Sequence, residues 1–219
     1  MTDATGDHLE TEHKYDADAG FVLPRFDGLP GVGVAGPELH HLHATYYDTE
    51  DLALSGSRVT LRRRVGGADE GWHLKLPVRA DTRQELHAPL GDGKAVPPRL
   101  SEQVADITGG RTLHPIAILD TERTTLTLTS SAGQVLAEVA DDSVTAVRLD
   151  ASGRPAAEPL RWREIEVEAG PDGQDGTGPG GRDGAAEIAA ALEAADRLLL
   201  DAGARRSSSA SKLGRLLGR

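Results

Sequence analysis

Polar and apolar residues alternate along much of this chain, a pattern typical of β-strands that bury one face. If residues 9–15 form a strand, successive side chains point to opposite faces, so Glu10, Glu12 and Lys14 share one face. The same alternation predicts further strands at residues 39–47, 58–65, 71–76, 82–88, 119–130, 134–142, 143–149 and 160–169. Glycine-containing turns between several of them predict hairpins, and hence antiparallel sheet.

The clearest of these stretches have one apolar face and one charged face. Residues 71–76, for example, place Leu74 on the apolar face and Lys75 on the charged one. In an open sheet such charges would face water, whereas in a closed antiparallel barrel they would face a lumen. Repetition over many strands favours the barrel, an α+β fold with helices packed on the outside. Leu61, Leu74 and Val167 are then expected to point outward beneath those helices.

Two segments before residue 110 show helical rather than alternating spacing. Residues 16–26 are predicted to form a short helix, with Asp16 or Asp18 as its N-cap. Residues 100–108 are predicted to form a second helix, capped by Ser101 and ended by two glycines.

The C-terminal part of the chain is predicted to be helical. Residues 170–184 are rich in Gly and Asp and are expected to form a flexible loop. The region that follows, 185–219, is predicted to contain helices at residues 185–201 and 211–217. Residues 1–219 together have the length of a single sizeable domain, which is the predicted organisation.

Residues 31–36 read Gly-Val-Gly-Val-Ala-Gly and match the letters of a dinucleotide-binding fingerprint. The fingerprint requires a strand before the glycines and a helix after them. Here Pro30 precedes the motif and Pro37 follows it. We therefore predict a plain loop at this position.

Three histidines, His40, His41 and His43, lie in the strand predicted at residues 39–47, and the last two share a face. Imidazoles two residues apart could contribute to a metal site. The sequence shows no evident third ligand, so we interpret them as partly solvated histidines.

The composition narrows the classes of partner. The formal net charge of −11 argues against nucleic-acid binding, because phosphate backbones are held by basic surfaces. The chain has no cysteine, which excludes disulfides, thiolate metal sites and a cysteine nucleophile. The chain does not begin with a basic segment followed by an apolar one, the pattern of a secretion signal. No apolar run is long enough to cross a bilayer. We therefore expect a cytoplasmic protein without a membrane partner.

We expect charges of both signs on the inner face of the predicted barrel. The inner cations would be Lys14, Arg62, Arg64, Lys75, Arg83, Arg123 and Lys212. The inner anions would be Glu10, Glu12, Glu85, Glu138, Asp142, Glu164, Glu166 and Glu168. Buried ions need partners or ligands to offset their lost hydration. Arginine and lysine suit phosphate oxygens, and carboxylates suit Mg²⁺ or Mn²⁺, so a polyphosphate with its metal ions would satisfy both sets.

The order of these motifs resembles that of a known family. The segment Glu10-Thr11-Glu12-His13-Lys14 matches the Glu-x-Glu-x-Lys signature of the CYTH domains, or triphosphate tunnel metalloenzymes. The remaining motifs follow in the family order: Tyr46-Tyr47-Asp48-Thr49, Leu61-Arg62-Arg63-Arg64, Trp72-His73-Leu74-Lys75, Arg83-Gln84-Glu85, Glu122-Arg123, Glu138 with Asp142, Glu164-Glu166-Glu168 and Ser211-Lys212-Leu213. The resemblance covers nearly the whole chain.

The resemblance implies an eight-stranded antiparallel tunnel that binds triphosphate compounds with a divalent metal. By similarity, the substrate would be held by Lys14, Arg62, Arg64, Lys75, Arg83, Arg123 and Lys212. The metal would be bound by Glu10, Glu12, Glu164, Glu166 and Glu168, with support from Glu85, Glu138 and Asp142. Within that set, the catalytic residues that also position the attacking water would be Glu10, Glu12, Glu166 and Glu168.

The expected function is metal-dependent hydrolysis of a triphosphate compound, with inorganic triphosphate as the leading substrate and Mg²⁺ or Mn²⁺ as the cofactor. Other family activities, hydrolysis of organic triphosphates and adenylate cyclase activity, are alternatives. A polyphosphate-binding module without catalysis is an alternative from another class. CYTH domains often precede a histidine-rich helical CHAD domain, which would be a partner if this chain is a fragment.

Overall fold

The computed structural model describes residues 8–79, 82–171 and 181–219, so most of the loop predicted at 170–184 lies outside the described residues. The elements in chain order are β1 His8–Ala17, β2 Val32–Asp48, α1 Ala53–Gly56, β3 Thr60–Val65, β4 Gly71–Pro77, β5 Thr82–Ala88, α2 Pro98–Gln103, α3 Ala105–Thr108, β6 His114–Ser130, β7 Val135–Arg148, β8 Leu160–Ala169, α4 Gly181–Asp201, β9 Arg205–Arg206 and α5 Lys212–Leu217.

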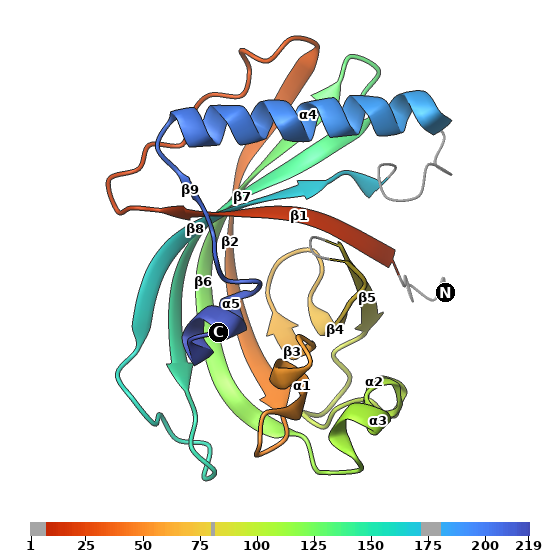
Figure 1. Cartoon of the computed structure of the whole chain (residues 1–219), viewed down its shortest axis with the longest axis vertical. Coiled ribbons are helices and arrows are strands. Elements are labelled where there is room, and N and C mark those ends of the chain that lie inside the picture. The colour runs from red at the N-terminus through yellow and green to blue at the C-terminus, as the bar shows by residue number, and fades with distance from the viewer. Residues whose placement is uncertain (1–7, 80–81, 172–180) are drawn as a thin grey trace.

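The strands form one antiparallel sheet that closes on itself. Its order is β5-β4-β3-β2-β6-β7-β8-β1-β9, and β5 also pairs with β1. Eight strands, β1 to β8, therefore make the predicted barrel, and β9 adds a short pairing to β1. Figure 1 shows the long strands curving around a central space.

The register of the ladders gathers charged side chains on the inner face. Glu12 of β1 lies opposite Glu168 of β8, which in turn lies opposite Glu138 of β7. Arg123 of β6 lies opposite Asp142 of β7. Since residues two apart along a strand share a face, this register places the alternating charges on one side of the barrel wall.

Helices cover the apolar outer face, as predicted. Val167 of β8 packs in one core cluster with Ile188 of α4, which lies across β7 and β8 (Figure 1). Leu61 and Leu74, from β3 and β4, pack in another cluster with Leu100 of α2. All five side chains are at most 2% exposed. Within the described residues, no helix combines the length and the apolar character that a membrane crossing would need.

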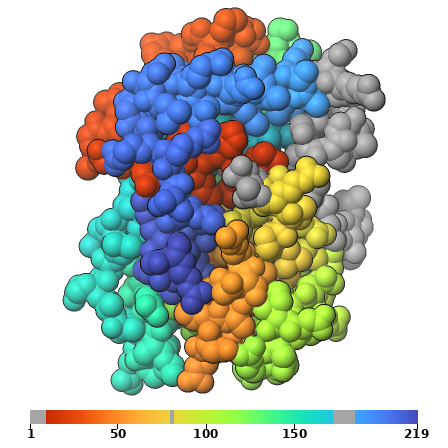
Figure 2. Space-filling view, in the orientation of Figure 1, coloured from red at the N-terminus to blue at the C-terminus, as the bar shows by residue number. Residues whose placement is uncertain are grey.

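Helix α5 packs on the inner side of the barrel instead. Its Leu213 belongs to a core cluster with Ala44, Leu119 and Val144. Leu119 and Val144 project from β6 and β7 to the same side as the inner charges. The C-terminal segment fills the space between the turn after β7 and the α1 region in Figure 2. One end of the barrel is therefore closed by the chain's own last helix.

The helix predicted at residues 16–26 is wrong. Strand β1 runs through Ala17, and no helix is found in the segment that follows. Asp16 and Ala17 continue the ladder with β8, so their backbone groups are already paired. The carboxylate of Asp16 binds Arg215 at 2.8 Å instead of capping a helix. Long-range pairing therefore overrides the local capping signal.

The loop predicted at residues 31–36 is also wrong, because β2 begins at Val32 and pairs with the far end of β6. The ladder shifts register between Ala35 and Glu38. A Cβ atom on Gly36 would lie 2.7 Å from the carbonyl oxygen of Thr125, so this position needs glycine for the close approach of the two strands. No helix follows the motif, which also removes the dinucleotide-binding interpretation.

Other predicted boundaries also differ from the structure. Helix α4 begins at Gly181, so residues 181–184 are helical rather than part of the loop predicted at 170–184. The helix predicted at residues 100–108 is divided into α2 and α3 at Val104, and Ser101 lies inside α2 rather than at its cap. The strands predicted at 134–142 and 143–149 are one continuous strand, β7.

Helix α1 was not predicted, and Asp48 accounts for it. This carboxylate is fully buried and accepts hydrogen bonds from the backbone N–H groups of Thr49 at 2.7 Å, Leu54 at 2.8 Å and Ser55 at 2.9 Å. A helix N-terminus presents unpaired N–H groups, which a nearby carboxylate satisfies. Asp48 therefore stabilises the turn that leads from β2 to β3.

Candidate functional site

The barrel encloses a cavity of about 650 Å³ that collects most of the predicted site residues. Its lining includes Glu10, Glu12, Lys14, Arg62, Arg64, Lys75, Arg83, Glu85, Arg123, Glu138, Glu166, Glu168 and Lys212. Asp142 and Glu164 do not line the cavity, and they are only 0% and 4% exposed. The structure therefore brings the predicted set together, with those two carboxylates behind the cavity wall.

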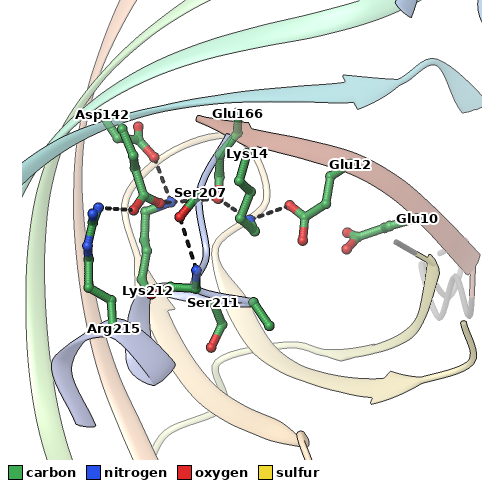
Figure 3. Close-up of polar contacts among 12 residues, drawn as sticks. Glu10, Glu12, Lys14, Asp142, Glu166, Ser207, Ser211, Lys212 and Arg215 are labelled. Carbon is green, nitrogen blue, oxygen red and sulfur yellow. Dashed lines mark hydrogen bonds and ion pairs between the residues drawn. The ribbon is translucent and has the colours of Figure 1, made fainter. Parts of the chain in front are cut away.

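Lys212 stands at the centre of the closed end of the cavity. Its Nζ lies 2.8 Å from Asp142, 2.7 Å from Glu164 and 2.8 Å from Glu166 (Figure 3). Burial alone would lower the pKa of this ammonium, but the three carboxylates outweigh burial and raise the pKa well above its ordinary value. Ser211 positions Lys212 by capping α5, since its Oγ accepts a hydrogen bond from the Gly214 N–H at 3.0 Å.

Arg123 and Lys14 complete this arrangement. The guanidinium of Arg123 donates to both oxygens of Asp142, at 2.8 and 2.7 Å, and to Glu166 at 2.7 Å. Lys14 contacts Glu166 and also Glu12, the latter at 2.7 Å. Burial opposes the charge on Glu166, yet Lys14, Lys212 and Arg123 together hold its pKa well below the usual range. We call Lys14, Arg123, Asp142, Glu164, Glu166 and Lys212 the Lys212 network.

The choice of Asp142 over Asp141 rested on strand alternation with Glu138. The structure places Asp142 against Arg123 and Lys212, on the inner side. Asp141 lies on the outer side, where Arg163 binds it at 2.7 Å. Only Asp142 therefore has access to the charged interior.

Four carboxylates gather toward the other end of the cavity, and we call Glu10, Glu12, Glu138 and Glu168 the mouth carboxylates. Burial raises the pKa of Glu168 to about 7, and the negative charges of Glu10, Glu12 and Glu138 add to this effect against the opposing Lys75. In the described part of the chain, no salt bridge joins Glu168 or Glu138 to a cation. Repulsion among carboxylates that lack cations is relieved by a bound divalent ion.

Two arginines of β3, Arg62 and Arg64, crowd positive charge together on another part of the cavity wall. The side chain of Arg64 is 4% exposed, and its pKa is lowered to about 9 by burial and by the neighbouring Arg62 and Arg123. The Nε atoms of Arg62 and Arg64 are buried without a hydrogen-bond partner. Asp69 contacts the terminal nitrogen of Arg64. Crowded guanidinium groups with unused donors form a site suited to phosphate oxygens.

Sequence reasoning did not assign a role to His73, which shares a strand face with Lys75. His73 is 3% exposed and its Nδ1 lies 2.5 Å from Glu85. Burial lowers the pKa of His73 to about 3, against the opposing effect of the hydrogen bond that its Nδ1–H donates to Glu85. Lys75 contacts Glu10 and lies 3.5 Å from Glu85. Glu85 therefore holds Lys75 and His73 in place, and the signal for His73 was its alternation with Lys75.

Arg83 lies beside the C-terminal segment. One of its terminal nitrogens donates to the carbonyl of Ala210 at 2.9 Å and the other to the carbonyl of Arg58 at 3.3 Å. Its Nε is 3.9 Å from Glu12. Arg83 therefore ties the segment before α5 to the barrel wall as well as lining the cavity.

Two kinds of acidic group could hold a metal ion. Asp142, Glu164 and Glu166 bring ligand atoms within 4.8 Å of one another, a spacing that a cation can bridge. In this structure the Nζ of Lys212 contacts all three. The mouth carboxylates offer oxygen ligands of the kind that Mg²⁺ and Mn²⁺ prefer, with fewer cations around them. The donor chemistry therefore fits a hard divalent ion better at the mouth.

Comparison with solved structures finds the same fold in other organisms. A proposed adenylate cyclase from Bacillus halodurans aligns with a TM-score of 0.57 and 15% identity over 96% of this chain and 98% of its own. The PH1819 protein from Pyrococcus horikoshii aligns with a TM-score of 0.51, 16% identity, and 95% and 98% coverage. A proposed adenylyl cyclase from Hippeastrum, described as having a dominant triphosphatase activity, aligns with a TM-score of 0.50, 14% identity, and 96% and 95% coverage.

Sequence comparison finds longer relatives. An uncharacterized protein found in two strains of Mycobacterium tuberculosis is 39% identical over 220 residues. The match covers 96% of this chain but 40% of the relative, so the chain spans less than half the length of that protein. The family model for the CYTH domain matches residues 8–174, which include strands β1 to β8. The chain therefore belongs to the CYTH domain family.

Proposed function

We propose that this protein hydrolyses a triphosphate compound with the help of a divalent metal, and that inorganic triphosphate is the substrate. The observation that carries the proposal is the division of charge inside one cavity. Among the described residues, Glu138 and Glu168 of the mouth carboxylates form no salt bridge, and the buried Nε donors of Arg62 and Arg64 have no hydrogen-bond partner. A triphosphate with its metal ion would satisfy both groups. The triphosphatase activity described for the Hippeastrum relative agrees with this proposal.

The mouth carboxylates would hold Mg²⁺ or Mn²⁺. When bound, such an ion lowers the pKa of water and neutralises charge on phosphate oxygens. Glu10 and Glu12 come from β1, whereas Glu138 and Glu168 come from β7 and β8, so ligands from three strands would converge. Glu168 is the residue we assign to accept a proton from the attacking water, because it lies between Glu12 and Glu138 in the strand ladders, beside the ion that they would hold.

The inner cations would bind and orient the substrate. Arg62 and Arg64 have unused buried donors and would contact phosphate oxygens directly. Lys14 and Arg123 already neutralise carboxylates of the Lys212 network, and would present their remaining donors to the phosphate nearest α5. Lys212 contacts three carboxylates and would contribute its positive charge there. Catalysis of phosphoryl transfer depends mainly on such positioning and on electrostatic stabilisation.

The cavity lining favours inorganic triphosphate over a nucleotide. Among the described lining residues, Tyr46 is the only Phe, Tyr or Trp, and it is 3% exposed. A nucleobase is usually held by stacking on an aromatic face, and a buried Tyr46 offers little surface for this. Helix α5 closes one end of the barrel, so a short linear anion would enter from the mouth.

A phosphate-release assay tests the proposal. The protein is incubated with Mg²⁺ or Mn²⁺ and with one substrate at a time, which is inorganic triphosphate, ATP or thiamine triphosphate. We expect turnover of inorganic triphosphate at the highest kcat/KM, and none with excess chelator. Absence of turnover with every substrate and both metals would refute the proposal. Formation of cyclic AMP from ATP would instead indicate a cyclase.

Matched variants separate catalysis from binding. Glu168→Gln should reduce kcat by roughly 100-fold or more, because it removes the proton acceptor and a metal ligand. Glu102→Gln is the control, since Glu102 is exposed on α2 and does not line the cavity. Tight triphosphate binding by the parent in calorimetry, without any hydrolysis, would indicate a binding module rather than an enzyme.

A further inference from the structure

A second cavity, of about 1080 Å³, is lined by outward-facing residues of β2 and β6, among others. His41, His43, Asp120 and Glu122 all line it, and all four are exposed. They form two cross-strand pairs, with His43 opposite Asp120 and His41 opposite Glu122. We propose that these residues form a surface site for a divalent transition metal of the zinc class, separate from the barrel cavity.

The spacing of the two histidines suits a chelate. Residues two apart on a strand point to the same face, with Cα atoms roughly 6.8 Å apart. Residues directly opposite on antiparallel strands have Cβ atoms about 5 Å apart. His41 and His43 therefore form one edge of a small rectangle, and Asp120 and Glu122 form the other. The structure supplies the acidic neighbours that the sequence of this strand alone did not reveal.

Asp120 orients one of the two rings. The Nδ1 atom of His43 lies 2.6 Å from the Asp120 carboxylate. A hydrogen bond at Nδ1 fixes the ring and leaves Nε2 as the atom that binds metal. Histidine ligands in metal sites commonly have this carboxylate partner. The ligands are therefore His43 Nε2, a ring nitrogen of His41 and the Glu122 carboxylate, with Asp120 as a positioning residue.

The charges around the pairs permit a cation. Four arginines also line this cavity. Arg163 is bound to Asp141, Arg205 to Asp18 and Arg215 to Asp16, whereas Arg161 forms no salt bridge among the described residues. Asp120 and Glu122 add two negative charges beside the histidines, which outweigh the one unpaired guanidinium and attract a divalent ion.

Binding requires a change of side-chain rotamers. Among the described residues, the group whose ligand atoms already lie within 4.8 Å of one another is Asp142, Glu164 and Glu166, in the barrel interior. His41 and Glu122 are exposed and not tightly packed, so they can adopt new rotamers at low cost. We therefore expect measurable but moderate affinity.

The ligand chemistry distinguishes this site from the barrel cavity. Imidazole nitrogens favour Zn²⁺, Co²⁺ or Ni²⁺, whereas the carboxylates of the cavity favour Mg²⁺ or Mn²⁺. Two histidines with one carboxylate leave a zinc-class ion with an open coordination position. This inference does not depend on the proposed hydrolysis, because it concerns residues on the opposite side of the barrel wall.

Co²⁺ titration of the full chain, in excess Mg²⁺, tests the proposal by visible absorption and calorimetry. We expect one saturable site, which His41→Ala and His43→Ala each abolish. Asp120→Asn should weaken binding by about 10- to 100-fold, through loss of the carboxylate that orients His43. In NMR spectra, Zn²⁺ should shift the Nε2 resonance of His43 rather than its Nδ1.

His40→Ala is the matched control, since His40 lies on the same strand but lines the barrel cavity. It should bind Co²⁺ like the parent, and circular dichroism should show that all variants are folded. Three results would overturn the proposal: no saturable Co²⁺ binding by the parent, unchanged binding in His41→Ala and His43→Ala, or equal loss in His40→Ala.

Discussion

The two ends of the barrel cavity contain the same kinds of residue but differ in how their charges are satisfied. In the Lys212 network, each carboxylate contacts a lysine or arginine of the chain itself. At the mouth, Glu138 and Glu168 form no such pair within the described residues, and Glu168 has a raised pKa. The two ends therefore differ in that unpaired carboxylates, among the described residues, are found at the mouth and not in the Lys212 network.

This difference shows that close spacing of carboxylates is not enough to identify a metal site. Asp142, Glu164 and Glu166 have the most closely gathered ligand atoms, yet an ammonium group already lies among them. An ion that replaced Lys212 would have to leave that buried ammonium unpaired, which costs several kcal/mol. An ion at Glu138 and Glu168, which form no salt bridge among the described residues, carries no such penalty.

The largest expected effect comes from removing the cation of the closed end. Lys212→Ala should lower the free energy of unfolding by about 3 to 5 kcal/mol, because it leaves buried Asp142 and Glu164 without their ammonium partner. Urea unfolding in chelator measures this loss. Glu138→Gln, at the exposed mouth, is the comparison and should change stability by less than about 0.5 kcal/mol. Equal losses of stability in the two variants would contradict the difference between the closed end of the cavity and its mouth.

The next effect concerns pH. The folded-state pKa of Glu168 is about 7, above its ordinary 4.5, so the folded protein holds this proton more tightly than the unfolded chain. The resulting stabilisation is present below pH 4.5 and is lost as the pH rises to 7. For the metal-free protein the loss should reach about 3 kcal/mol.

Glu168→Gln should remove this pH dependence. The measurement is the difference in unfolding free energy between parent and variant, in chelator, from pH 4 to pH 8. Taking the difference cancels the opposite trend of His73, whose lowered pKa of about 3 makes the protein gain stability between pH 3 and 6.5. A difference that stays constant with pH would show that Glu168 is not held protonated.

A metal ion bound by the mouth carboxylates should stabilise the folded protein. At 100 times its dissociation constant, Mg²⁺ or Mn²⁺ should raise the free energy of unfolding by about 2.7 kcal/mol. Glu168→Gln should reduce this gain, whereas Glu164→Gln should keep most of it. Thermal melting with and without metal measures both. The reverse ranking would place the metal in the Lys212 network.

Arg64→Met is expected to change stability less than Lys212→Ala or metal binding does. Replacing this crowded guanidinium relieves repulsion from Arg62 and Arg123 but also loses the contact with Asp69, so stability should change by less than about 1 kcal/mol. The KM for triphosphate should nevertheless rise at least tenfold, through loss of a phosphate contact. A large loss of stability with unchanged KM would assign Arg64 a structural role.

Strand alternation predicted much of this molecule because it is a local property. The interval between Glu10, Glu12 and Lys14 depends only on the pleat of one strand, so the inner face could be assigned before the strands were paired. The prediction at residues 16–26 failed because the decisive interactions, the ladder with β8 and the ion pair with Arg215, come from residues far away in the chain.

The sequence by itself determined the face of each charged strand residue and the choice of Asp142, since both follow from a period of two residues. The repetition of that pattern, with motifs in the order of a known family, indicated the barrel. Only the tertiary structure decided which charges meet. Lys212 reaches Asp142, Glu164 and Glu166 because α5 packs inside the barrel, and nothing in a seven-residue helical segment specifies that position. Whether a carboxylate is paired depends on three-dimensional proximity, and that pairing separates the closed end of the cavity from its mouth.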